Sequence, residues 1–189
     1  MVKFKKKSLS GSSKRWIQRH HNDDLVYRAK KLGYRSRAVF KLEEINNKFN
    51  FLQKEHNIVD LGSSPGSWSQ FLNKKGFKNI LAIDVLKMDN VENVNFILGD
   101  FTDESVQKKI FEKFPIINTI ISDIAANTTG NKKIDAFNTN SISLNVLAFA
   151  KSNLKSNGIV LCKYFNGELD KDIIDFARNN FNKNKIIKP

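Results

Sequence analysis

Aspartate residues stand at the ends of three consecutive short apolar runs in this sequence. The runs end at Asp84, at Asp100 and at Asp123. A run that is apolar throughout is typical of a strand covered on both faces of a sheet. In parallel α/β sheets ligands bind beyond the carboxyl ends of the strands, so we expect the three carboxylates to line one rim. Asp84, at the second strand, would accept hydrogen bonds from ribose hydroxyls, and Asp100 from an adenine amino group.

A loop with two glycines follows the first apolar run. Gly62 and Gly66 allow the backbone to approach a ligand closely, because neither carries a Cβ. The loop differs from the G-x-G-x-x-G fingerprint of dinucleotide sites, since Ser64 replaces the second glycine and Pro65 has no backbone N–H. We therefore expect a ligand without a pyrophosphate, which argues against an NAD-dependent dehydrogenase.

A lysine, Lys163, lies near the end of the last apolar run. Such a lysine usually extends to solvent. If it faces the rim beside Asp123, it becomes a candidate general base. A base needs a pKa nearer the working pH than the ordinary lysine value of ~10.4. Burial and a neighbouring cation both lower the pKa of a lysine.

The apolar runs alternate with helical stretches. We expect strands at 57–62, 79–85, 94–100, 118–124 and 158–165, and helices at 67–75, 102–114, 134–153 and 169–181. This alternation predicts an α/β fold with a doubly wound, mostly parallel sheet. Two more helices are expected before the sheet, at 24–32 and at 36–49, the second capped by Ser36.

Positive charge is concentrated at the N-terminus. The 189 residues carry a net charge of +13, and residues 1–41 hold thirteen Lys and Arg against two Asp. This distribution indicates a polyanionic partner, with nucleic acid favoured. A solvated tail or an organelle transit sequence are the alternatives. An anionic membrane surface fits less well, because the segment has no clean apolar face.

The composition excludes several classes of protein. No apolar run approaches the ~18 residues that a bilayer-spanning helix needs. One Cys rules out a disulfide framework and fits a reducing compartment. The three His show no spacing typical of metal ligands, so we expect no metal. We expect an intracellular protein, in the cytoplasm or an organelle such as the mitochondrion.

Several motifs together resemble one known family. In order from about Ser12 to Pro189 they are SSKRWIQRH, YRSRAVFKLEEI, VDLGSSPGSWSQFL, AIDVLKMD, LGDFTDE, SDIAANTTG and CKYFNGE. They are similar to the FtsJ/RrmJ family of S-adenosylmethionine-dependent RNA ribose 2′-O-methyltransferases. The resemblance implies a Rossmann-like class I methyltransferase and a monomer. It divides the chain into a flexible tail (1–13) and one domain (14–189), with a basic RNA-binding arm (14–50) and a donor-binding and catalytic core (57–189).

The resemblance also implies roles for individual residues. The methyl-donor pocket would be formed by Gly62, Gly66, Trp68, Asp84, Asp100 and Asp123. The catalytic residues would be Lys41, Asp123 and Lys163. Lys163 would be the base that takes the proton of a ribose 2′-hydroxyl, Lys41 would lower its pKa by charge repulsion, and Asp123 would orient the lysine or the donor.

The implied substrate is RNA. The arm would hold the RNA backbone through Arg15, Arg19, Arg35 and Arg37. The opening SSKRW-x-x-R-H resembles the ribosomal branch, which acts on a uridine of large-subunit rRNA. The alternatives are tRNA as substrate and a non-catalytic RNA-binding module.

The sequence departs from the family in two places. Ala126 stands where the family usually has Pro. The family also continues beyond the final Lys-Pro, with a catalytic glutamate and a closing antiparallel strand. Either the native chain continues past Pro189, or the enzyme lacks its final strand. We expect the first, because loss of that strand would expose an edge of the sheet.

Overall fold

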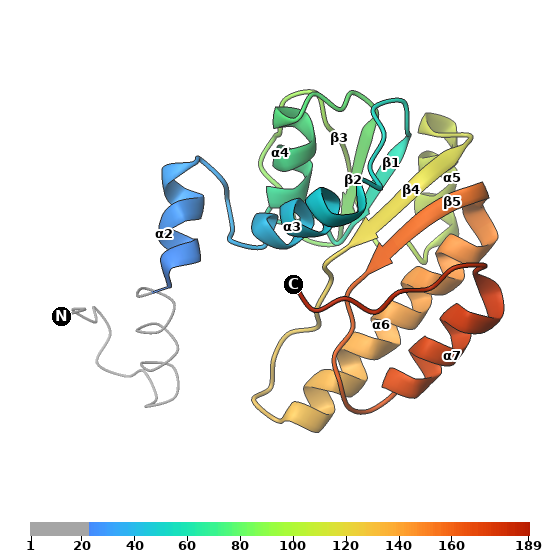
Figure 1. Ribbon diagram of the computed structural model, residues 1–189. Helices are drawn as coiled ribbons and strands as arrows, with labels where there is room; N and C mark the ends of the chain where they lie inside the picture. Colours follow the sequence, from blue (N-terminus) through green and yellow to red (C-terminus); the bar gives the residue numbers. More distant parts are fainter. Residues whose placement is uncertain (1–22) are drawn as a thin grey trace.

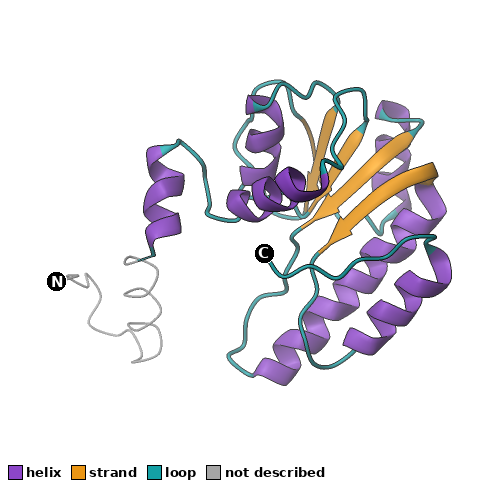
Figure 2. Ribbon diagram, viewed as in Figure 1, coloured by secondary structure: helices purple, strands orange, loops and turns teal. Residues whose placement is uncertain are grey.

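A parallel sheet forms the centre of the computed structural model, which describes residues 23–189 (Figures 1 and 2). Its five strands are β1 (Ile58–Leu61), β2 (Ile80–Asp84), β3 (Asn95–Leu98), β4 (Ile117–Ser122) and β5 (Leu154–Cys162). They lie in the order β3-β2-β1-β4-β5, and every neighbouring pair is parallel. The predicted doubly wound α/β sheet is confirmed.

Helices connect the strands close to the predicted positions. They are α2 (Asp24–Lys31), α3 (Val39–Phe49), α4 (Ser67–Lys74), α5 (Glu104–Lys113), α6 (Lys132–Asn153) and α7 (Asp170–Asn180). The predicted cap of α3 is wrong, because the helix begins three residues after Ser36, with Ala38 at the N-cap position. The Ser36 hydroxyl instead lies 2.8 Å from that of Ser67 and joins the chain before α3 to α4.

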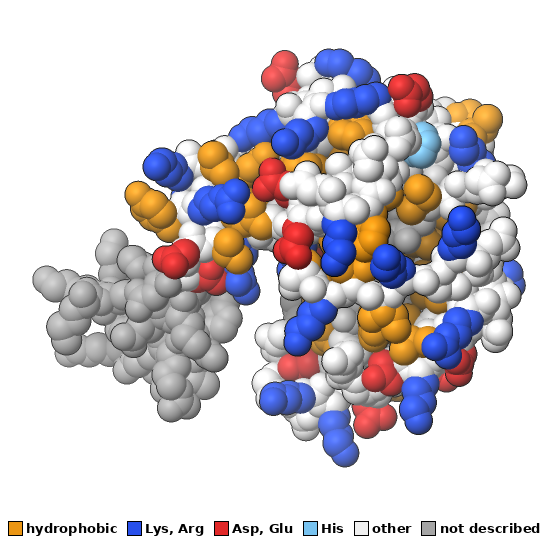
Figure 3. All heavy atoms as spheres, viewed as in Figure 1, with side chains coloured by type: hydrophobic (Ala, Val, Ile, Leu, Met, Phe, Trp, Pro, Cys, Tyr) orange, Lys and Arg blue, Asp and Glu red, His pale blue; other side chains and the backbone are white. Residues whose placement is uncertain are grey.

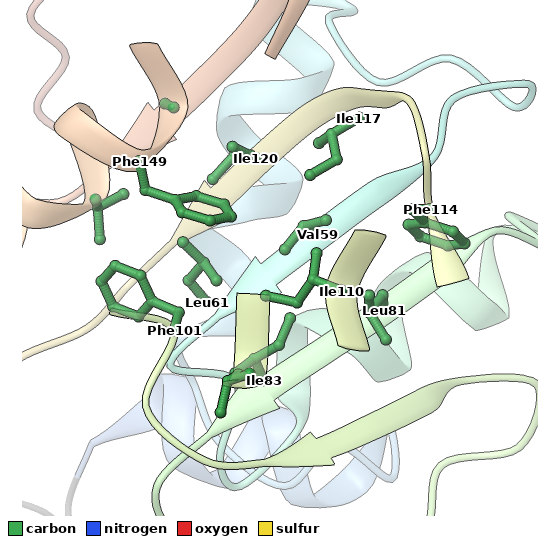
Figure 4. Packing of buried hydrophobic residues seen from close by; sticks show 13 residues of the cluster. Val59, Leu61, Leu81, Ile83, Phe101, Ile110, Phe114, Ile117, Ile120 and Phe149 are labelled. Carbon is green, nitrogen blue, oxygen red and sulfur yellow. The ribbon is translucent and has the colours of Figure 1, made fainter. Parts of the chain in front are cut away.

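The two faces of the sheet are covered by different helices (Figure 2). On one face, Val59 and Ile120 pack against α5 and α6, where Phe149 and Phe101 meet edge to face (Figure 4). On the other face, Ile58 packs against α3 and α4. Successive residues of a strand point to opposite faces, so each face of the central strands has its own hydrophobic core.

The outer strands are less buried than the sequence predicts. All residues of β1 and β4 are buried, but β3 and β5 are only partly buried. β5 also begins earlier than predicted, at Leu154, and ends at Cys162. These strands lie at the edges of the described sheet, where fewer helix side chains reach them. Apolar composition alone does not distinguish a central strand from an edge strand.

The parallel arrangement brings the carboxyl ends of all strands to one edge. Residues 32–38 pass along this edge between α2 and α3, and α2 lies away from the sheet (Figure 1). The predicted tail 1–13 and the residues Arg15 and Arg19 lie outside the described part of the chain. Within residues 23–189, no helix combines the length and the apolar character needed to cross a bilayer.

Candidate active site

Two lysines share one carboxylate beyond the ends of β4 and β5. Lys41 Nζ lies 3.1 Å from both carboxylate oxygens of Asp123. Lys163 Nζ lies 3.2 Å from Asp123 Oδ1 and donates to the Asp123 backbone carbonyl at 2.5 Å. Three residues that are far apart in the sequence are therefore brought together, as the sequence predicts.

Strand pairing explains the position of two of these residues. Ser122 of β4 pairs with Cys162 of β5, and the Lys163 N–H donates to the Ser122 carbonyl at 3.0 Å. Asp123 and Lys163 are thus neighbours just past the paired ends. Lys41 reaches them from α3, which is held on the sheet by the fully buried Leu42.

The two lysine side chains differ in how deeply they are buried. The side chain of Lys163 is 20% exposed and that of Lys41 is 45% exposed. Burial lowers the pKa of Lys163, and the Lys41 cation lowers it further, against the opposing effect of Asp123. A larger fraction of Lys163 is therefore neutral at a given pH than for an exposed lysine, which is what a general base requires.

Cys162 directly precedes Lys163, but its side chain is not suited to acid–base or nucleophilic chemistry. Burial raises the pKa of its thiol to about 12. A thiol with such a pKa stays protonated at physiological pH and is a poor nucleophile. We therefore assign it to packing.

Asp84 and Asp100 line the neighbouring part of the same edge. Asp84 Oδ2 accepts from the Ser64 N–H at 2.8 Å, and its Oδ1 accepts from the Leu86 N–H at 2.7 Å. Asp100 Oδ1 accepts from the Thr102 N–H at 2.9 Å and from its hydroxyl at 2.8 Å. A carboxylate has about four acceptor positions, so both can still accept from a ligand.

This rim fits a nucleoside. Asp84 and Asp100 follow adjacent strands and offer oxygens to hydroxyl and amino groups. Val85 and Leu86, directly after Asp84, are 63% and 65% exposed and provide an apolar surface beside the carboxylate. Polar acceptors next to exposed apolar side chains match a ligand with a ribose and a flat aromatic base.

The two loop glycines are required by the packing of the protein itself. Both have positive φ, +72° at Gly62 and +104° at Gly66. A Cβ at Gly62 would lie 1.8 Å from an Ile124 side-chain carbon, and one at Gly66 would lie 2.6 Å from Arg35 Nη1. The sequence predicts glycine here for close approach of a ligand, and the structure adds this second reason.

Trp68 is buried where α4 meets α3. Its side chain is 5% exposed, and its Nε1–H donates to the Ala38 carbonyl at 2.8 Å. This contact joins α4 to the start of the helix that carries Lys41. Its predicted part in a donor pocket stays a prediction.

The described arginines of the arm have partners within the protein. Arg37 Nη1 lies 2.7 Å from Asp23 Oδ2, and the Arg37 side chain is 53% exposed. The guanidinium of Arg35 donates to three backbone carbonyls instead, at Pro65, Asp89 and Asn90. The two arginines therefore do not have equivalent surroundings, although the sequence predicts the same role for both.

Sequence reasoning missed two buried polar residues of α6. Asn140 accepts from the Phe165 N–H at 2.8 Å and donates to the carbonyls of Phe165 and Glu168 at 2.8 and 2.7 Å. The Ser143 hydroxyl lies 2.7 Å from the Lys163 carbonyl oxygen. Both residues hold the chain that follows β5. The signal in the sequence was polar residues on the buried face of a long helix.

Sequence reasoning also missed a basic groove beside the cluster. The groove measures about 1370 Å³ and runs between α3, β5, α7 and residues 182–189. Among the described residues that line it, Asp123 is the one carboxylate, against Lys41, Lys151, Lys155, Lys163, Arg178, Lys183, Lys185 and Lys188. The signal for this groove in the sequence was that residues 176–189 contain four cationic residues and no acidic one. Basic side chains are also frequent over the face of the molecule in Figure 3.

Within residues 23–189, no three His, Cys, Asp or Glu side chains are grouped so that they could hold a metal ion.

Comparison with a solved structure defines the class of protein. A protein from Plasmodium falciparum described as a ribosomal RNA methyltransferase superimposes with a TM-score of 0.69 and 34% identity, over 77% of this chain and 86% of that one. The fold is thus that of a Rossmann-like methyltransferase.

Sequence comparison defines the family. Residues 34–189 match the FtsJ-like methyltransferase family. "Ribosomal RNA large subunit methyltransferase E" of Legionella pneumophila (strain Lens) is 39% identical over 182 residues, 94% of this chain and 88% of that protein. The protein of the same name from Agrobacterium fabrum (strain C58 / ATCC 33970) is 39% identical over 193 residues, 99% of this chain and 78% of that protein. The chain belongs to the FtsJ-like methyltransferase family and is an enzyme of that family, as its motifs predict.

Proposed function

We propose that this methyltransferase transfers a methyl group from S-adenosylmethionine to the ribose 2′-hydroxyl of a nucleotide, a uridine, in large-subunit rRNA. The observation that carries the proposal is the cluster of Lys41, Asp123 and Lys163. It places a partly buried lysine next to a carboxylate and a second cation, on the edge of the sheet that also carries the nucleoside rim.

In this proposal the methyl donor binds at the carboxylate rim. Asp84 accepts from the ribose hydroxyls of the donor and Asp100 from its adenine amino group. Gly62 and Gly66 shape the loop above the pocket, and Trp68 holds this loop against α3. When bound, S-adenosylmethionine supplies an electrophilic methyl group on a positively charged sulfur, and it leaves as S-adenosylhomocysteine.

The protein then removes one proton and holds the reacting groups. A ribose hydroxyl is a weak nucleophile, so it must lose its proton as its oxygen bonds to the methyl carbon and the carbon–sulfur bond breaks. Lys163 Nζ accepts this proton in its neutral form, and the resulting ammonium is stabilised by the carboxylate and the carbonyl of Asp123. Burial and, to a smaller extent, charge repulsion by Lys41 lower the pKa of Lys163 and so favour its neutral form. Positioning of the two substrates supplies much of the rate.

Charge supports RNA as the substrate. Residues 1–41 carry the concentrated positive charge, and the charged residues that line the groove beside Lys163 are mostly cations. Arg15, Arg19 and Arg37 would bind phosphates, because the guanidinium fork bonds two phosphate oxygens at once. The printed names of the relatives favour large-subunit rRNA over tRNA. In this proposal residues 57–189 form the catalytic core of a protein that acts as a monomer.

The experiment is the transfer of labelled methyl from S-adenosylmethionine to undermethylated large ribosomal subunits, with bulk tRNA in parallel. We expect label on a ribose of the subunit rRNA. The variant Lys163→Ala should bind S-adenosylhomocysteine as the unmodified protein does and lose turnover by about 100-fold or more, the range for removal of a general base.

Other outcomes have distinct meanings. Label on tRNA alone would keep the chemistry and reject the proposed substrate. Turnover that survives in Lys163→Ala would show that Lys163 is not the base. RNA binding without any methyl transfer, and without an effect of the donor, would favour the binding-module alternative.

A further inference from the structure

Arg35 joins two loops that are far from it in the sequence. Its Nη1 donates to the carbonyls of Pro65 at 2.9 Å and Asp89 at 2.8 Å, and its Nη2 donates to the carbonyl of Asn90 at 2.8 Å. Pro65 lies in the loop after β1, and Asp89 and Asn90 lie in the segment after β2. A guanidinium has five donors in a rigid plane, so one side chain can hold both segments at once.

These two segments border the proposed donor pocket. They are already joined at the end near the sheet, where Asp84 accepts from the Ser64 N–H and the Ser64 hydroxyl donates to the Leu86 carbonyl at 3.0 Å. Arg35 joins them a second time, through Pro65 on one segment and Asp89 and Asn90 on the other. The two loops beside the proposed pocket are therefore connected by two separate sets of hydrogen bonds.

The surroundings of Arg35 hold it in this position. Its own N–H donates to the side chain of Gln70 in α4 at 3.0 Å. Its Nη1 occupies space that a Cβ at Gly66 would fill, and Met88 lies at the same place. The glycine and the arginine thus fit each other, which explains why residue 66 carries no side chain.

This arrangement uses three of the five donors of Arg35, which leaves fewer for the phosphate contact that the sequence predicts. Both hydrogens of Nη1 and one of Nη2 already donate to carbonyls, so binding a phosphate through that edge would break contacts to one or both loops. Arg37 is two residues away, its side chain is more than half exposed, and its partner is the carboxylate of Asp23. It can exchange that partner for a phosphate without moving the donor loops.

We propose that Arg35 is a positioning residue of the methyl-donor pocket, through which the segment between α2 and α3 sets the geometry of the two donor loops. The inference rests on the proposed function, because it needs the donor to bind between these loops. It means that the arm contributes to donor binding as well as to RNA binding.

The test is the affinity for S-adenosylhomocysteine, measured by calorimetry on Arg35→Ala, Arg35→Lys and Arg37→Ala. Arg35→Ala should bind about tenfold more weakly, since it loses hydrogen bonds from a charged donor. Arg35→Lys keeps the charge but cannot span both loops, so it should also bind more weakly, by a smaller factor. Arg37→Ala should bind S-adenosylhomocysteine like the unmodified protein. In turnover assays Arg35→Ala should raise KM for the donor and leave KM for the RNA unchanged.

Each other outcome is informative. If Arg35→Ala and Arg35→Lys bind S-adenosylhomocysteine normally and lose affinity for RNA, Arg35 is a phosphate contact and the inference is wrong. If the unmodified protein itself does not bind S-adenosylhomocysteine, the proposed function fails first. Thermal unfolding without ligand shows whether Arg35→Ala is folded. If it is not, Arg35→Lys decides, and normal donor affinity in that variant overturns the inference.

Discussion

Lys41 and Lys163 contact the same carboxylate but differ in burial. Lys163 is the more buried, and burial is the main reason for its lowered pKa. Lys41 is nearly half exposed. At the scale of single residues, this difference supports the proposal that Lys163 takes the proton and that Lys41 gives electrostatic support.

This division predicts a shift in the pH dependence of turnover. The neutral form of Lys163 is active, so kcat should rise with pH through the pKa of Lys163. Lys41→Gln removes a cation that lowers this pKa, so the pKa rises and the profile moves to higher pH. The measurement is kcat against pH at saturating donor and RNA.

Lys48→Gln provides the matched control for Lys41→Gln. Lys48 lies on the same helix, is exposed, and its ammonium group lies 5.7 Å from the ring centre of Phe49. Its substitution should leave the profile in place. An unshifted profile in Lys41→Gln would mean that Lys41 does not tune the base.

At the scale of elements, α6 does more than cover the sheet. Three residues on one buried face of this helix, Thr139, Asn140 and Ser143, are polar. They bond to the chain after β4 and after β5, which carries the proposed catalytic residues Asp123 and Lys163. A purely apolar helix would pack as well, but it would leave the backbone groups of these loops without partners.

Asn140→Ala should therefore affect both stability and catalysis. It leaves the N–H and the carbonyl of Phe165 and the carbonyl of Glu168 without their partner, which costs about 1–3 kcal/mol of unfolding free energy. We expect a lower kcat, because the loop after Lys163 loses its anchor, and an unchanged affinity for S-adenosylhomocysteine. Denaturant unfolding and single-turnover kinetics measure the two effects.

Asn145→Ala serves as the control, since Asn145 lies on the exposed face of the same helix. It should change neither quantity. A destabilised Asn140→Ala with normal kcat would limit the role of Asn140 to stability.

At the scale of the whole molecule, the positive charge and the proposed donor site lie in different parts of one chain. Residues 1–41 hold thirteen Lys and Arg against two Asp, while the proposed donor site lies between loops of the core. Residues 32–38 connect the two, through the contacts of Arg35, Ser36 and Ala38 to the loop after β1 and α4. The two binding events should thus respond differently to salt.

We expect RNA affinity to fall steeply as salt rises, because binding releases counterions from phosphates. Affinity for S-adenosylhomocysteine should change little over the same range. Arg37→Ala should reduce the slope of log K against log salt by about one, as for loss of one phosphate contact. Binding titrations at several salt concentrations test this, and a slope that is the same in Arg37→Ala would exclude Arg37 from the RNA interface.

Much of this architecture is readable from local patterns in the chain. The alternation of short apolar runs with helices predicts the parallel sheet, and a parallel sheet necessarily collects its strand ends at one edge. That is why Asp84, Asp100 and Asp123 could be assigned to one rim before any contact was known. Family motifs added Lys41, which no periodicity would have connected with Asp123.

Other features depend on contacts between residues distant in sequence, and these needed the folded chain. Residue types along 32–38 cannot show that Arg35 bonds to carbonyls 30 to 55 positions away while Arg37 pairs with Asp23. The burial of β5, the polar face of α6 and the lowered pKa of Lys163 likewise depend on which elements pack together. Composition and spacing determine the local secondary structure and the edge of the sheet at which a residue lies. The burial of a side chain and its hydrogen-bond partners are decided only when the helices and strands pack together, because they depend on residues distant in the sequence.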